Sequence, residues 1–231
     1  MKKIIVYKLT DKFGQTKDNT KWGNNVSHTA KGKGKELCSD GWIHYYTHPL
    51  LAVLMNPIHA KFASPKLWEA EASGKIINEP FKSGCKTLTT IKKIPLPEIS
   101  RVQKIAFGIL CAKEVCKGKA WNKWADKWLS GKDRSRESAD AAADDAYNAD
   151  DAYAARDAAY AARSAATHAT HAARAAAAYA AYAARAAARA AAAAYAADAA
   201  RAANARAAYA AAADAKLINF IELAEKAMTY K

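Results

Sequence analysis

Two histidines, His44 and His48, are the first candidates for chemistry in this chain, because imidazole binds metal ions and transfers protons near neutral pH. A zinc site needs further ligands at matched positions. Pro49 argues against a helix with both histidines on one face, and neither a carboxylate nor a cysteine stands beside them at zinc-ligand spacing. Cys111 and Cys116 form only a loose pair. No metal site is therefore predicted.

The residues around His44 are also candidates for a nucleotide site. A strand of the form Gly-aromatic-apolar-His, followed by Tyr45 and Tyr46, resembles the nucleotide-binding strand of ADP-ribosyltransferase-like folds. That resemblance implies a histidine on the ribose and a tyrosine stacked on nicotinamide; the alternative is a structural histidine beside two strand tyrosines. Glu69 and Glu71 lie in an ordinary alternating strand, so no catalytic glutamate can be placed. We predict no catalytic residue and no cofactor, and favour a non-enzymatic role.

A segment rich in tryptophan and lysine is the third candidate. Trp121, Trp124 and Trp128 recur at steps of three and four, so a helix would carry them on one face. Three tryptophans on one face most often pack on a core. The functional alternatives are a platform for single-stranded nucleic acid, which we favour, and a helix at a membrane surface, which we do not. The nucleic-acid candidates are Lys119, Trp121, Lys123, Trp124, Lys127 and Trp128.

The charge of the chain is divided unevenly. Residues 1–137 hold 26 basic and 12 acidic side chains, whereas residues 138–231 hold 10 of each, so the net charge of +14 belongs to the first part. A basic domain favours nucleic acid or another anionic ligand, although solubility alone is the alternative. The roughly twenty polar, Gly/Lys-rich residues that follow Gly14, through residues 31–35, predict a mobile loop. A Gly/Lys loop can cradle phosphate, but these residues match no Walker pattern. Irregularly spaced cysteines indicate reduced thiols and a cytoplasmic protein.

The elements that must position these residues are four predicted strands and two predicted helices. Strands are predicted at residues 4–9, 42–45, 67–72 and 85–94. Pro49 follows a cap at Thr47 or His48 and begins a short buried helix. Pro97 begins a second helix, whose apolar positions recur at three and four. The sequence therefore predicts an α+β N-terminal domain over residues 1–115.

Four short segments of this domain carry a family resemblance: residues 37–44, 49–50, 68–74 and 87–91. Together they resemble an uncharacterised family of phage and prophage proteins. Its members carry a Gly-Phe-His-Ala-Cys-Glu-Asn-Pro-Leu segment, a Val-Glu-Ala-Gly-Gly strand and a Ser-Lys-Leu-Thr strand, and many continue into Ala/Ser-rich repeats. This chain departs from the pattern at residues 42–43 and 45–48. The resemblance implies a phage context, and hence the cytoplasm of the host cell, but no established activity.

The last part of the chain is dominated by alanine. No Gly or Pro occurs after Lys132, so residues 138–231 predict a long alanine-rich α-helix or helical bundle, joined to the first domain by a helical connector over residues 116–137. Tyr153 and Tyr160 share a heptad register typical of a coiled coil. A conventional apolar face near the C-terminus must be buried, by folding back or, as we favour, in a homo-oligomer. The oligomerisation candidates are Tyr153, Tyr160, Leu217, Ile221 and Met228.

Three hypotheses follow from these patterns. The first is a non-enzymatic phage-type accessory protein, in which a basic domain binds nucleic acid while the alanine-rich helix oligomerises or acts as a spacer. The second is a nucleotide-handling protein, either ADP-ribosyltransferase-like or nucleotide-sequestering. The third is a purely structural helical scaffold.

Overall fold

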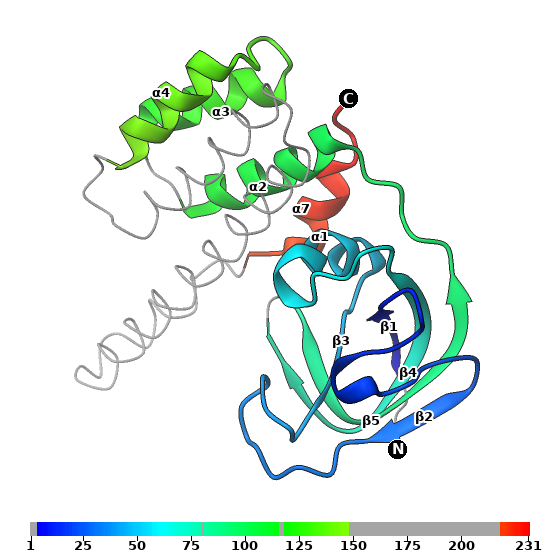
Figure 1. Ribbon diagram of the computed structural model, residues 1–231. Coiled ribbons are helices and arrows are strands. Elements are labelled where there is room, and N and C mark those ends of the chain that lie inside the picture. The colour runs from blue at the N-terminus through cyan, green and yellow to red at the C-terminus, as the bar shows by residue number, and fades with distance from the viewer. Residues whose placement is uncertain (1–3, 80, 116–117, 148–217) are drawn as a thin grey trace, which may run out of the picture. The chain divides into compact units, whose positions relative to one another are not determined.

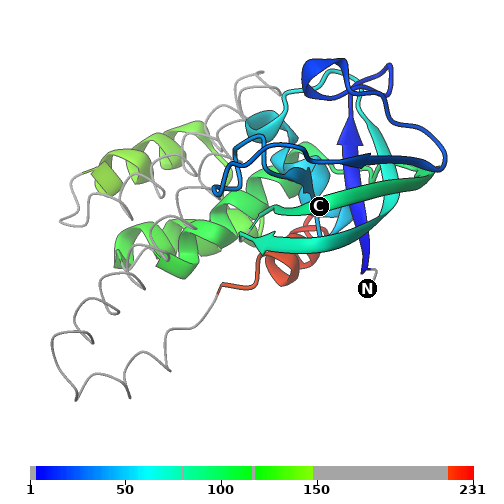
Figure 2. The same ribbon diagram turned by 90° about the horizontal axis from the view of Figure 1, so that it is seen from below.

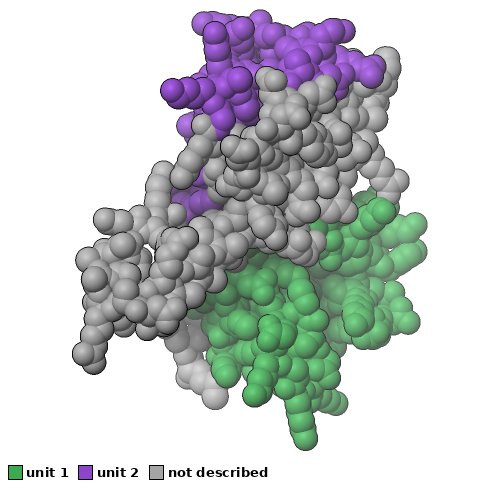
Figure 3. Space-filling model, turned by 90° about the vertical axis from the view of Figure 1, so that its left-hand side faces the viewer, with its two compact units in different colours: residues 1–98 green, residues 99–231 purple. Residues whose placement is uncertain are grey.

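The computed structural model describes residues 4–79, 81–115, 118–147 and 218–231. The chain divides into two compact units, residues 1–98 and residues 99–231, which Figure 3 distinguishes by colour. Each unit is described by itself. No helix in these described ranges is both long and apolar enough to cross a membrane.

The first unit is built on a five-stranded antiparallel sheet (Figure 1). The two longest strands, β4 and β5, form a hairpin that supplies its centre, and β1 pairs with the free side of β4. The other side of β5 pairs with β3 near its beginning and with β2 further along. The strands are β1 (Ile4–Thr10), β2 (Val26–Thr29), β3 (Ile43–Tyr45), β4 (Lys66–Asn78) and β5 (Ser83–Ile94).

The sheet curls until its two flanks meet (Figure 2). Tyr7 N donates to Tyr46 O and Tyr46 N donates to Tyr7 O, each over 2.8 Å, so β1 is joined to the residue that follows β3. The inner face carries a cluster of buried side chains from four strands and one loop. Its members are Val6, Trp22, Tyr45, Ala70, Ala72, Cys85 and Leu88.

A short helix, α1 (Pro49–His59), joins β3 to β4 and packs against β1. His48 is its N-cap, because its Nδ1 accepts from Leu50 N at 3.3 Å, and Pro49 occupies the first turn, where no backbone donor is needed. The cap and the buried helix predicted here are confirmed. A 3₁₀ turn, η1 (Lys17–Asn19), lies between β1 and β2.

The second unit is helical in its described part. α2 (Arg101–Val115) begins with a capping box, in which Ser100 Oγ accepts from Gln103 N at 3.2 Å and Gln103 Oε1 accepts from Ser100 N at 2.8 Å. α2 packs against α7 (Phe220–Ala227) and α3 (Lys119–Leu129), and α3 packs against α4 (Arg136–Tyr147).

The predicted α+β class of the N-terminal domain is wrong: its described part is an antiparallel sheet with few, short helices. The helix after Pro97, which was to complete an α+β domain, lies in the second unit. Residues 26–29, expected to be loop, form strand β2 on the edge of β5. The strand that was to end at Gly74 continues to Asn78 because a bulge, with Gly74 at a φ of +80°, keeps it paired with β5.

The predicted long alanine-rich helix or helical bundle over residues 138–231 can be followed only at its two ends. Residues 148–217 lie outside the described part of the chain. At its far end Asn219 is not helical; its Oδ1 accepts from Ile221 N at 3.2 Å and Glu222 N at 3.3 Å. Because Asn is a strong N-cap, α7 begins as a new helix at Phe220 instead of extending one rod to the C-terminus.

Candidate functional site

Helix α3 displays a row of three lysines. Gly118 is its N-cap, and Lys119, Lys123 and Lys127 follow at intervals of four residues, so they share one side of the helix. All three are exposed. Successive members are separated by about 6 Å along the helix axis, since each residue rises about 1.5 Å. We call these three residues the helix row.

The tryptophans of α3 lie on its other side and are buried. Trp121, Trp124 and Trp128 are 2%, 7% and 0% exposed. The rings of Trp121 and Trp124 are 5.7 Å apart, and the Arg134 guanidinium lies 4.8 Å from the Trp128 ring centre. In this arrangement the tryptophans are packing residues, and their burial fixes which side of α3 turns outward. The outward side of α3 therefore carries the lysines and not the tryptophans.

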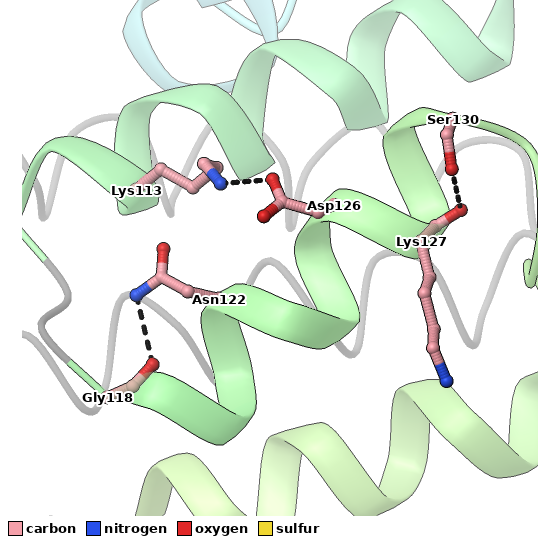
Figure 4. A network of polar contacts seen from close by, with 6 residues as sticks. All are labelled: Lys113, Gly118, Asn122, Asp126, Lys127 and Ser130. Atoms are coloured by element: carbon pink, nitrogen blue, oxygen red, sulfur yellow. Dashed lines mark hydrogen bonds and ion pairs between the residues drawn. The ribbon is translucent and has the colours of Figure 1, made fainter.

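Figure 4 shows polar contacts of α3 together with Lys127, one member of this row. Lys113 of α2 forms an ion pair with Asp126, the acidic residue of α3. Asn122 Nδ2 donates to Gly118 O at 2.9 Å, which secures the first turn. Because Lys113 compensates the Asp126 carboxylate, the acid offsets less of the positive potential of the helix row.

A second row of lysines lies in the first unit, on the loop between β2 and β3. Lys31, Lys33 and Lys35 are exposed, whereas the glycines between them are half-buried. This alternation arises because the segment contains no turn or bend, and successive residues of an extended chain face opposite sides. The lysines therefore point outward together, with about 6.6 Å between successive members. We call them the loop row.

Glycines hold the loop row against the rest of its loop. A Cβ on Gly32 would lie 2.1 Å from Asp40 Cγ, and a Cβ on Gly34 would lie 2.1 Å from Ser39 Oγ. A Cβ on Gly41 would lie 2.0 Å from Gly34 O, a backbone atom that no side-chain rotation can move. Only glycine fits at these close approaches, so the two arms of the loop touch.

Side chains complete this packing. Asp40 Oδ1 accepts from Gly34 N at 3.1 Å, and Trp42 Nε1 donates to Lys35 O at 3.1 Å. Lys86 of β5 donates from Nζ to Gly41 O at 2.7 Å and lies 4.9 Å from the Trp42 ring centre. The loop is therefore folded, where the sequence alone suggested a mobile segment. The Lys-Gly-Lys-Gly-Lys alternation of the sequence is consistent with an extended segment, but it does not reveal the contacts that hold this segment in place.

The predicted nucleotide-site residues are engaged in packing. His44 Nε2 lies 2.5 Å from Leu37 O, and burial lowers the pKa of His44, while that hydrogen bond acts in the opposite direction. Tyr45 is 1% exposed and belongs to the inner cluster. Tyr46 is 6% exposed; its hydroxyl is hydrogen-bonded to His59 Nδ1 at 3.2 Å, and burial raises its pKa. The three side chains do not converge on one open site.

Two of the predicted oligomerisation residues can be placed. Ile221 and Met228 are half-buried in and just after α7, which packs against α2 of its own chain through Phe220, Ala224 and Ala227. Gln103 of α2 donates from Nε2 to Met228 O at 2.8 Å. Tyr153, Tyr160 and Leu217 lie outside the described residues, and the prediction of a homo-oligomer stays a prediction.

No protein-family model matches this chain, and no significant match to a curated protein or a solved structure was found. Within the described ranges, no group of three or more His, Cys, Asp or Glu side chains is arranged so that it could hold a metal ion.

Proposed function

We propose that the chain is a non-enzymatic, phage-type accessory protein that binds nucleic acid through its phosphate backbone. The observation that carries the proposal is the presence of two rows of exposed lysines, the loop row in the first unit and the helix row in the second. The phage context rests on the motif resemblance of residues 1–115.

The spacing of both rows supports a backbone ligand. Members of each row follow one another at about 6 to 7 Å, as extended-chain and helix geometry require. That distance is comparable with the separation of successive phosphates along one nucleic-acid strand. Each lysine can therefore face one phosphate, and each contact gains free energy from the release of counterions.

The type of cation supports contact without sequence reading. Residues 1–98 contain sixteen lysines and no arginine. Arginine reads guanine edges through two parallel hydrogen bonds, whereas lysine acts on phosphate as a point charge. We therefore expect affinity that depends on salt and strand length and little on base sequence.

The nucleotide-handling alternative gains no support from His44, Tyr45 and Tyr46, because each is taken up by a contact within the fold. The tryptophans of α3 likewise support packing more than base stacking. Phosphate contacts by lysine remain the interaction that the exposed side chains support best.

The test measures how the affinity of the intact chain for a long oligothymidylate falls with salt. We expect linear dependence of log K on log salt concentration over roughly 50 to 200 mM. When one strand contacts both rows, changing Lys31, Lys33 and Lys35 together to Gln should reduce the slope by about 2, since each phosphate contact on a single strand contributes about 0.7. The same loss is expected when the helix row, Lys119, Lys123 and Lys127, is changed to Gln.

The matched control changes three exposed lysines that belong to neither row, Lys61, Lys75 and Lys93, to Gln. This variant loses the same charge, so its slope should stay close to that of the unchanged chain. No binding at low salt would refute the proposal, and equal losses in the control and row variants would show that net charge alone attracts the ligand.

A further inference from the structure

The turn that follows β1 exposes an aromatic ring. Phe13 is 70% exposed, more than any other large apolar side chain in the described residues. Burying such a ring would gain free energy, so its position needs a cause. A single exposed apolar residue is ordinary. A fixed turn beneath the ring and a cation beside it are less common, and both are present at Phe13.

The turn is fixed by hydrogen bonds. Asp11 Oδ1 accepts from Phe13 N at 2.8 Å and from Gln15 N at 2.7 Å, and Asp11 O accepts from Gly14 N at 3.1 Å. Gly14 adopts a φ of +81°, and Gly14 O accepts from Trp22 N at 2.7 Å. The backbone on both sides of the ring is therefore held in place, and a ligand would lose little free energy in ordering it.

One cation lies beside the ring, and two more are exposed on the same connection between strands. Lys12 Nζ lies 4.9 Å from the Phe13 ring centre, within the range of a cation–π contact. Lys17 and Lys21, in the same connection between β1 and β2, are also exposed. Single-strand binding surfaces combine an exposed ring with basic side chains: the ring stacks on a base and the cations contact the phosphates. Phe13 on its fixed turn, Lys12 beside it and the exposed lysines of the same connection offer this combination.

We infer that Phe13 is a stacking site for an unpaired base, with Lys12, Lys17 and Lys21 facing the neighbouring phosphates. This inference rests on the proposed function and adds a ligand class to it. Stacking needs a base free of its partner strand, so the site makes the protein prefer single strands to duplexes. The lysine rows alone give no such preference.

The experiment compares oligothymidylate with an abasic strand of the same length and charge, using the intact chain and three variants. Phe13→Ala removes the ring, Phe13→Leu keeps an apolar side chain without a π face, and Phe13→Trp restores stacking. Because the side chain is exposed, all three should keep the melting temperature of the unchanged chain, which is measured in parallel.

The unchanged chain and Phe13→Trp should bind oligothymidylate about tenfold more tightly than the abasic strand. Phe13→Ala and Phe13→Leu should lose most of this ratio while keeping their affinity for the abasic strand and their salt slope. Equal ratios for all four proteins would overturn the stacking site and leave the lysine rows standing. Failure of the unchanged chain to bind either strand would overturn the proposed function itself.

A lipid surface is the competing partner for an exposed ring among lysines. Vesicles containing anionic lipid are therefore offered to the same four proteins. Loss of vesicle binding in Phe13→Ala, with an unchanged oligothymidylate ratio, would assign the ring to a membrane and overturn the inference.

Discussion

Lys8 is a buried cation inside the curled sheet of the first unit. Its Nζ donates to His44 O at 2.7 Å and lies 5.0 Å from the Trp22 ring centre. The contact joins β1 to β3, next to the place where Tyr7 and Tyr46 close the sheet. Burial lowers the pKa of Lys8 to about 8, and the nearby Cys85 acts weakly in the other direction. A charge in this position holds the flanks together but is costly to keep protonated.

The free energy of unfolding should therefore rise as the pH increases from about 8 to 9. In this range the unfolded chain, whose lysine pKa is the usual 10.5, binds more protons than the folded chain, so deprotonation stabilises the fold. The rise should be about 1 kcal/mol per pH unit. Denaturant unfolding at several pH values measures the free energy of unfolding of the unchanged chain and of Lys8→Met. The variant should lack the rise between about pH 8 and 9.

Cys85 opposes this rise in the free energy of unfolding at higher pH. Burial raises the pKa of its thiol from 9.0 to about 11. Between these values the folded chain holds the proton that the unfolded chain has lost, so this group lowers stability as pH rises. Exposed Lys93→Met serves as the control for Lys8→Met. A rise of equal slope in Lys8→Met and Lys93→Met would mean that Lys8 does not titrate as its burial requires.

At the scale of elements, the loop between β2 and β3 depends on close backbone contact. A Cβ on Gly41 would meet Gly34 O at 2.0 Å, whereas a Cβ on Gly23 would meet only Val26 Cγ2 at an ordinary 3.5 Å. Gly41→Ala must therefore separate the two arms of the loop, while Gly23→Ala is accommodated. We expect Gly41→Ala to lower stability by about 1 to 3 kcal/mol.

The same two variants, Gly41→Ala and Gly23→Ala, are then compared for their affinity for oligothymidylate. If the loop row works because its lysines are held in line, Gly41→Ala should weaken oligothymidylate binding although it removes no charge. Gly23→Ala should bind as the unchanged chain does. Full affinity in Gly41→Ala would show that an open, mobile Lys-rich loop suffices, as the sequence first suggested.

The contrast between elements also shows what local sequence could predict. The helix that begins at Pro49 was predictable, because its cap, its proline and its apolar residues are all local signals. Strand β2 was not, since residues 26–29 contain a single apolar residue, Val26, and become a strand only by pairing with β5. Gly74 looked like the end of a strand, yet the bulge it forms is stabilised by pairing with a distant partner.

The candidate site, like the fold, could be predicted from the sequence only in part. The exposed helix row follows from helical spacing, so Lys119, Lys123 and Lys127 could be identified from the sequence. Whether the tryptophans faced a ligand or a core could not be decided, because both uses require the same spacing. The folded loop depends on contacts of Gly41 and Asp40 with the other arm, which alternation alone does not reveal.

At the scale of the whole molecule, positive charge is concentrated in residues 1–137, and each compact unit contributes one lysine row. Two rows in one chain can contact the same strand or act separately. If one strand occupies both, the contacts share one binding event and their counterion terms add. If a strand occupies only one row at a time, removing the other row leaves the salt slope of that event unchanged.

A variant that changes all six lysines to Gln distinguishes these cases. Simultaneous contact predicts that the slope for a long oligothymidylate falls by about 4, the sum expected for six single-strand phosphates. It also predicts that a strand long enough to reach only one row binds with the smaller slope of three contacts. Separate action predicts that two strands bind per chain even when each strand is long, because each row then binds its own strand. Light scattering on the saturated complex counts the strands, and two long strands per chain at full affinity would rule out a single shared path.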